Sequence, residues 1–156
     1  MNKAKSRFRI FGLVITLWLV YFPVLSQTLE NPGQTKTIRL LTIGNSFSNN
    51  ACKFLPQITA SVPGHKIEIT KATIGGCSLE KHANLITACE EDTNTKPYEG
   101  KYCLVDLLKQ GPYDIVTIQQ LSLLSYKPDS YQPYANTIVD FVKQHVPDAD
   151  IRIHQT

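Results

Sequence analysis

Short apolar segments alternate with amphipathic ones after residue 37, and this alternation predicts strands separated by helices. Residues 38–43 are mostly apolar and too few for a helix, so they suit a central strand covered on both faces. Residues 66–72 alternate polar and apolar side chains, which is typical of a strand at the edge of a parallel sheet. Residues 114–120 and 151–154 predict a third and a fourth strand.

Helical spacing of apolar residues predicts four helices, over residues 50–61, 78–91, 102–110 and 129–146. Strands that alternate with helices indicate an α/β domain with a parallel sheet. An edge position for the second strand gives the strand order 2-1-3-4 in a flavodoxin-like, three-layer α/β/α architecture. Because the sequence stops directly after the fourth strand, we expect this architecture to be incomplete at the carboxyl terminus.

The amino terminus differs from the rest of the chain. Four basic residues precede an uncharged, mostly apolar run over residues 10–27, a pattern typical of a secretory signal peptide. We expect a signal peptide over residues 1–26, a linker over 27–37 and one domain over 38–156, with a secreted or periplasmic location. The alternative is a retained membrane anchor, and contact with a membrane is expected only in that case.

Removal of the signal peptide would change the charge balance. The chain has 16 basic and 13 acidic residues, and loss of the four basic ones leaves 12 against 13. A nearly neutral domain with 42% hydrophobic and 19% charged residues is typical of a globular protein, and it offers no basic patch for nucleic acid.

Four cysteines, Cys52, Cys77, Cys89 and Cys103, fit an oxidising compartment. Sequence allows three pairings; we favour Cys89 with Cys103, which would close a polar loop, and the alternative is that no bridge forms. No cysteine pair has the short spacing of a zinc knuckle, so neither a metal nor a cofactor is expected.

Residues 44–50 would carry the first strand into a helix capped by Asn49 or Asn50. Gly44 can adopt backbone conformations and close approaches that a side chain forbids. Ser46 would then lie at the carboxyl end of the strand, at the edge where open α/β sheets bind ligands.

Gly44-Asn45-Ser46-Phe47-Ser48 after an apolar strand resembles the first block of the SGNH (GDSL-type) hydrolase superfamily. The resemblance assigns Ser46 as the nucleophile. Asn45 stands where many members have aspartate, which fits a poorly characterised, secreted bacterial branch. The alternative is a serine that only caps or turns the chain.

Two further segments are similar to later blocks of the same superfamily. The resemblance implies that the backbone N–H of Gly76, or of Gly75 instead, binds the oxyanion together with the N–H of Ser46. It also implies an amide donor after the third strand, and we prefer Gln120 to Gln119 for this role.

The block of the superfamily that supplies the base, Asp-x-x-His, is absent from the 156 residues. We therefore interpret the sequence as truncated before that block. His82 is expected at the surface or behind the site, and His154 in a structural or supporting role. Asn45, Gly75 and Gln119 are also expected to support the site without taking part in the reaction. Tyr98, in the polar loop between the cysteines, is a further candidate for contact with substrate.

The resemblance implies a secreted serine hydrolase that deacylates a carbohydrate or another small carboxylic ester, and that is weak or inactive without the missing block. The alternative is a secreted glycan-binding module with the same fold and no chemistry. A nucleotide-binding domain is disfavoured, because the turn at Gly44 lacks the glycine spacing and the lysine of a phosphate loop.

Overall fold

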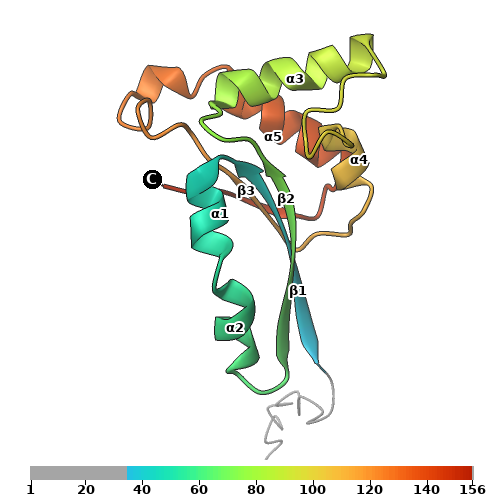
Figure 1. The fold of residues 1–156 in the computed structure, drawn as a ribbon, viewed down its shortest axis with the longest axis vertical. Coiled ribbons are helices and arrows are strands. Elements are labelled where there is room, and N and C mark those ends of the chain that lie inside the picture. Colours follow the sequence, from blue (N-terminus) through green and yellow to red (C-terminus); the bar gives the residue numbers. More distant parts are fainter. Residues whose placement is uncertain (1–34, 156) are drawn as a thin grey trace, which may run out of the picture. The chain divides into compact units, whose positions relative to one another are not determined.

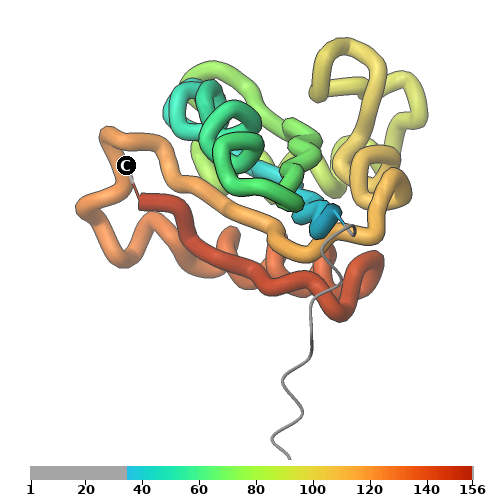
Figure 2. The backbone as a smooth tube through the Cα atoms, turned by 90° about the horizontal axis from the view of Figure 1, so that it is seen from below, coloured from blue at the N-terminus to red at the C-terminus, as the bar shows by residue number. Residues whose placement is uncertain are grey.

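The computed structural model describes residues 35–155, which contain one four-stranded parallel sheet (Figure 1). The strands are β1 (Lys36–Gly44), β2 (His65–Thr73), β3 (Ile115–Ile118) and β4 (Asp150–Ile153). Their order is β2-β1-β3-β4, which confirms the predicted α/β fold and the edge position of the second strand. Figure 2 shows β3 and β4 side by side, as their parallel pairing requires.

Helices cover both faces of the sheet (Figure 1). One face is covered by α1 (Ser46–Cys52) and α2 (Leu55–Ala60). The other is covered by α3 (Leu79–Glu91), α4 (Leu104–Leu108) and α5 (Tyr134–His145). The predicted three-layer arrangement is therefore confirmed.

The main core lies between the sheet and the second group of helices. Leu41 and Ile43 of β1 point to this face and pair in register with Val116 and Ile118 of β3. All four side chains are at most 1% exposed and pack against α3, α4 and α5. Burial of a side chain of this size contributes about 1.5–3 kcal/mol, so this face fixes the strand register.

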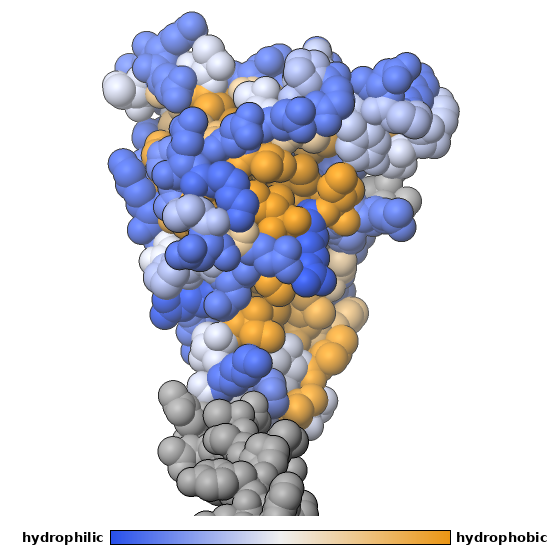
Figure 3. All heavy atoms as spheres, turned by 180° about the vertical axis from the view of Figure 1, so that it is seen from behind, coloured by the Kyte–Doolittle hydropathy of each residue, from blue (hydrophilic) through white to orange (hydrophobic). Residues whose placement is uncertain are grey.

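The opposite face is covered more thinly. Helix α2 has no buried residue, and Phe54, Ile58 and Val62 along this segment are between 50% and 61% exposed. On the side that faces away from the viewer in Figure 1, hydrophobic residues also reach the surface in a band (Figure 3).

The start of the first helix differs from the prediction. Instead of beginning near residue 50, α1 begins at Ser46 and is capped by Asn45, whose Oδ1 accepts a hydrogen bond from the N–H of Phe47 at 3.1 Å. Asn49 and Asn50 lie inside the helix. A second helix, α2, follows with Pro56 in its first turn, where the missing proline N–H costs nothing.

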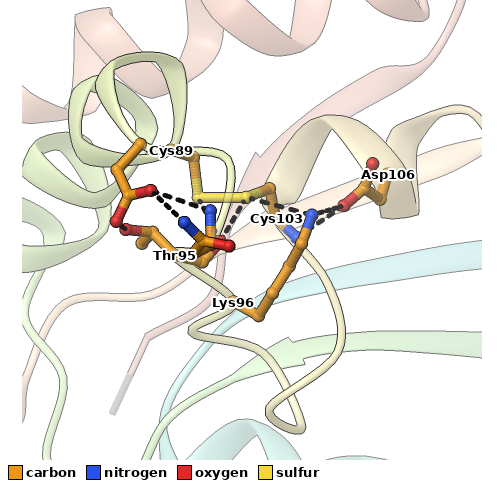
Figure 4. Close-up of polar contacts among 7 residues, drawn as sticks. Cys89, Thr95, Lys96, Cys103 and Asp106 are labelled. Carbon is orange, nitrogen blue, oxygen red and sulfur yellow. Dashed lines mark hydrogen bonds and ion pairs between the residues drawn. A yellow bond between two sulfur atoms is a disulfide. The ribbon is translucent and has the colours of Figure 1, made fainter.

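A disulfide joins Cys89 at the end of α3 to Cys103 at the start of α4, and confirms the favoured pairing (Figure 4). Next to it, Asp106 accepts a hydrogen bond from the N–H of Cys103 at 2.8 Å and pairs with Lys96 at 3.1 Å. The bond from Cys103 and the charge of Lys96 lower the pKa of Asp106. The other two cysteines, Cys52 and Cys77, are buried free thiols.

The predicted signal peptide lies outside the described residues, as does all of the predicted linker except its last residues. Strand β1 already begins at Lys36, two residues before the predicted start. Within residues 35–155 we find no helix with the length and apolar character needed to cross a membrane.

Candidate active site at the carboxyl edge of the sheet

Ser46 lies at the carboxyl edge of the sheet, one residue after the Asn45 that follows β1. Its side chain is exposed. Within residues 35–155, no hydrogen bond engages the hydroxyl or the backbone N–H of Ser46. An N–H in the first turn of a helix has no partner within the helix, so this one can serve an external acceptor.

Gly44 lets β1 approach the residues behind Ser46. A Cβ atom at this position would collide with Oγ of Ser48 and would lie 3.0 Å from both Cβ and Oε1 of Gln119. Both of these side chains are completely buried. A glycine is therefore required here for close packing.

Asn45 joins the loops that follow three different strands. Its side chain is 1% exposed, and Nδ2 donates to the carbonyl oxygens of Cys77, at 3.2 Å, and Gln120, at 3.3 Å. Because Oδ1 caps α1 at the same time, every polar atom of this carboxamide is engaged. Asn45 therefore positions the turn that carries Ser46 and does not face a ligand.

Gln119 makes a second set of buried contacts. Its Oε1 accepts hydrogen bonds from the N–H of Ser48 at 3.0 Å, the hydroxyl of Ser48 at 2.8 Å and the N–H of Asn45 at 3.4 Å. Its Nε2 lies 3.2 Å from Nδ1 of His154, which follows β4. One carboxamide thus connects α1 to the half-buried imidazole of His154.

The expectation that Gln120 donates to an oxyanion is wrong. Its Nε2 donates to the carbonyl oxygen of Ser130 at 2.8 Å and to the hydroxyl of Ser130 at 3.2 Å. Its Oε1 accepts from the N–H groups of Leu79 and Leu121. With both amide hydrogens committed and 1% exposure, Gln120 holds loops together. The sequence could not distinguish it from Gln119, because strand alternation stops where β3 ends.

Gly75 and Gly76 form an exposed turn after β2, closed by a hydrogen bond from the N–H of Cys77 to the carbonyl oxygen of Ile74 at 3.1 Å. Gly76 has φ of 63°, a conformation that favours glycine. Within the described part of the chain, neither glycine N–H has a hydrogen-bond acceptor. A Cβ at either position would meet nothing within 4 Å.

Of the two positions expected for His82, at the surface or behind the site, the structure shows the second. The imidazole is 0% exposed, with Nε2 3.0 Å from the carbonyl oxygen of Gly44 and Nδ1 2.9 Å from the hydroxyl of Tyr98. Desolvation lowers the pKa of His82 to about 4, against the smaller opposing effect of the bond to Gly44, so the ring is neutral at pH 7. His82 supports the end of β1 and cannot also reach Ser46 as a base.

Tyr98 is likewise a buried partner and not a substrate contact. It is 1% exposed, and burial raises the pKa of its hydroxyl. Its contact with His82 links the disulfide loop to β1. No sequence pattern pointed to this pair, because the two residues belong to different elements.

The described residues supply no activating base for Ser46. None of the histidines in residues 35–155 forms a hydrogen bond with it: His82 binds Gly44 and Tyr98, and His154 faces Gln119. The same residues contain no group of three or more histidine, cysteine or acidic side chains that could hold a metal ion.

The fold and the site define an α/β protein with a parallel sheet and an exposed serine at the carboxyl edge. A crystal structure of a DUF4886 family protein from Bacteroides uniformis is similar to it, with a TM-score of 0.66 and 27% sequence identity. The similarity covers 78% of this chain and 50% of that protein, so the chain spans half the length of the solved protein it matches. No protein-family model and no curated protein matches the sequence.

Proposed function

We propose that the protein is a serine hydrolase that acts on carboxylic esters outside the cytoplasm, with Ser46 as the nucleophile. One observation carries this proposal. The hydroxyl and N–H of Ser46 and the N–H of Gly76 have no partner within the described residues, whereas the buried side chains behind them are fully hydrogen-bonded. Uncommitted donors that are held rigidly are what an oxyanion site needs.

In the proposed reaction, the hydroxyl oxygen of Ser46 bonds to the acyl carbon of the ester and its proton passes to a base. The two N–H groups stabilise the negative oxygen of the tetrahedral intermediate. The alcohol then leaves with a proton, and water releases the acid from the acyl-serine. The SGNH resemblance suggests a carbohydrate or another small ester as substrate.

The missing base sets the expected rate. A serine hydroxyl is a weak nucleophile at neutral pH unless a base lies within hydrogen-bond reach. Because no described histidine bonds to Ser46, we expect residues 1–156 on their own to hydrolyse esters weakly or not at all.

The test compares p-nitrophenyl acetate hydrolysis and fluorophosphonate labelling in the 156-residue chain and in any longer in-frame product of the same coding sequence. We expect labelling at Ser46 in the longer product, loss of hydrolysis in Ser46→Ala, and no loss in Ser61→Ala, which removes another exposed serine. Hydrolysis that survives Ser46→Ala in every form would disprove the proposed nucleophile.

A glycan-binding module without chemistry is the second candidate. Leu123 and Tyr126, in the loop that follows β3 at the same edge, are 74% and 73% exposed, and an exposed apolar and aromatic pair suits a binding surface. Glycan binding that persists in Ser46→Ala, together with no labelling at Ser46 in any form, would favour this candidate.

A further inference from the structure

The orientation of the Gln119 carboxamide is determined by backbone donors. The N–H of Ser48 lies 3.0 Å from one of its terminal atoms, and the N–H of Asn45 lies 3.4 Å from the same atom. A backbone N–H can only donate, so this atom must be the oxygen, Oε1. The other terminal atom is then the nitrogen, Nε2, which can only donate.

This orientation fixes the hydrogen on the imidazole of His154. Nε2 of Gln119 lies 3.2 Å from Nδ1 of His154, so Nδ1 must accept. A neutral imidazole with an accepting Nδ1 carries its hydrogen on Nε2. The N–H of His154 donates to the carbonyl oxygen of Ile118 at 2.9 Å, which ties this residue to β3.

We propose that His154 presents an N–H at the carboxyl edge of the sheet and donates it to an oxygen of the bound ester or of the acid product, and that Gln119 is the positioning residue that holds this tautomer. The identity of the ligand depends on the proposed function. The assignment of the hydrogen to Nε2 depends only on the contacts of Gln119 and His154. No described residue accepts a hydrogen bond from Nε2 of His154, and the ring is only half-buried.

This assignment gives His154 a different role from that of a general base. A base for Ser46 would need a lone pair on the nitrogen that points away from Gln119, and in this tautomer that nitrogen carries the hydrogen. A donor after β4 supplies the side-chain hydrogen bond that the sequence led us to expect from Gln120. The base must then be another group.

The other three of the four histidines provide internal references. Nδ1 of His65 lies 3.0 Å from the carbonyl oxygen of Pro63, and Nδ1 of His145 lies 2.8 Å from that of Phe141. A carbonyl oxygen can only accept, so both rings carry the hydrogen on Nδ1. By the same reasoning, His82 carries it on Nε2.

Long-range proton–nitrogen correlation spectra of the isotope-labelled chain at neutral pH test the tautomer, with signals assigned by single histidine substitutions. We expect Nε2–H for His154 and His82, and Nδ1–H for His65 and His145. A hydrogen on Nδ1 of His154, alone or in a doubly protonated ring, would overturn the proposal.

Two variants test whether Gln119 sets the tautomer. In Gln119→Glu a carboxylate oxygen replaces the nitrogen opposite His154, so Nδ1 of His154 should become protonated. The matched control, Ser48→Ala, retains the backbone N–H that orients Gln119, so its spectrum should match that of the wild type. If the Gln119→Glu protein folds and the tautomer of His154 is unchanged, Gln119 is not the positioning residue. If this variant does not fold, the spectrum of the wild type still tests the tautomer.

Titration with acetate, the acid product of a deacetylation, tests the ligand contact without requiring catalysis. We expect a saturable shift of the Nε2–H signal of His154 that exceeds any shift at His145. No shift at saturating acetate would overturn the contact, even with the tautomer as stated. The two proposals can fail separately. If the tautomer and the acetate shift are as expected but hydrolysis does not depend on Ser46, the proposed nucleophile is refuted and the role of His154 as a donor stands.

Discussion

Two layers of polar groups meet at the carboxyl edge of the sheet, and they differ in how their hydrogen bonds are used. The inner layer consists of Asn45, Ser48, His82, Gln119 and Gln120, which are at most 1% exposed and fully engaged with one another or with backbone groups. The outer layer consists of the hydroxyl and N–H of Ser46, the N–H of Gly76 and Nε2 of His154, which have no hydrogen-bond partner within the described residues. The inner layer holds the geometry of the edge, and the outer layer offers the donors that the proposed ligand would bind.

The largest effect is expected from Asn45→Ala, which breaks the inner layer. It leaves the buried carbonyl oxygens of Cys77 and Gln120 without donors, at about 1–3 kcal/mol each, and removes a helix cap worth about 1 kcal/mol. We expect the free energy of unfolding, measured in urea, to fall by roughly 3–7 kcal/mol.

Asn45→Asp is the matched variant. Its carboxylate can still accept from the N–H of Phe47 but cannot donate to either carbonyl oxygen. We expect it to remain much less stable than the wild type at neutral pH. Wild-type stability in this variant would show that the two donated bonds are unimportant.

The next largest effect is expected from His82, whose protonation should make the free energy of unfolding depend on pH. Its pKa is about 4 in the folded protein against 6.5 in an unfolded chain, so between these values the unfolded state binds the extra proton. The stability due to the neutral ring is present above pH 6.5 and is lost as the pH falls through 4, a change of about 3 kcal/mol. Urea unfolding at several pH values should show a flatter profile in His82→Gln, and an equal slope in both proteins would contradict the assignment.

Gly44→Ala should cost about 1–3 kcal/mol, because the added methyl group collides with the buried side chains of Ser48 and Gln119. Gly75→Ala is the matched control in the outer turn, where the methyl group meets nothing within 4 Å. We expect Gly75→Ala to stay within about 0.5 kcal/mol of the wild type in thermal unfolding. Equal losses in both variants would show that the inner layer is not tightly packed.

The smallest stability effect separates the two serines of α1. Ser48→Ala removes a buried hydroxyl that donates to Gln119 at 2.8 Å, and should lower stability by about 1 kcal/mol. Ser46→Ala removes an exposed hydroxyl without a described partner and should change stability by less than about 0.5 kcal/mol. Urea unfolding of the pair measures this, and a larger loss in Ser46→Ala would place Ser46 in the inner layer.

The sequence predicted the sheet well, because an apolar run marks β1 and alternating polar and apolar residues mark β2. It predicted the first helix poorly, since α1 has mostly small and polar residues and its cap, Asn45, lies within a polar run. The inner layer was harder still. The buried side chains of His82 and Gln120 form hydrogen bonds with Tyr98 and Ser130, respectively. Contacts between different elements leave no periodic pattern in the sequence.

The disulfide between Cys89 and Cys103 bears on how this protein should be prepared. The loop it closes carries Tyr98, whose hydroxyl meets His82, which in turn holds the carbonyl oxygen of Gly44, two residues before Ser46. Material produced in a reducing cytosol would lack the covalent closure of this loop, which two hydrogen bonds connect to Gly44. In such material the carboxyl end of β1 loses part of its support, and an activity assay measures this altered form. The state of the disulfide should therefore be stated with every measured activity.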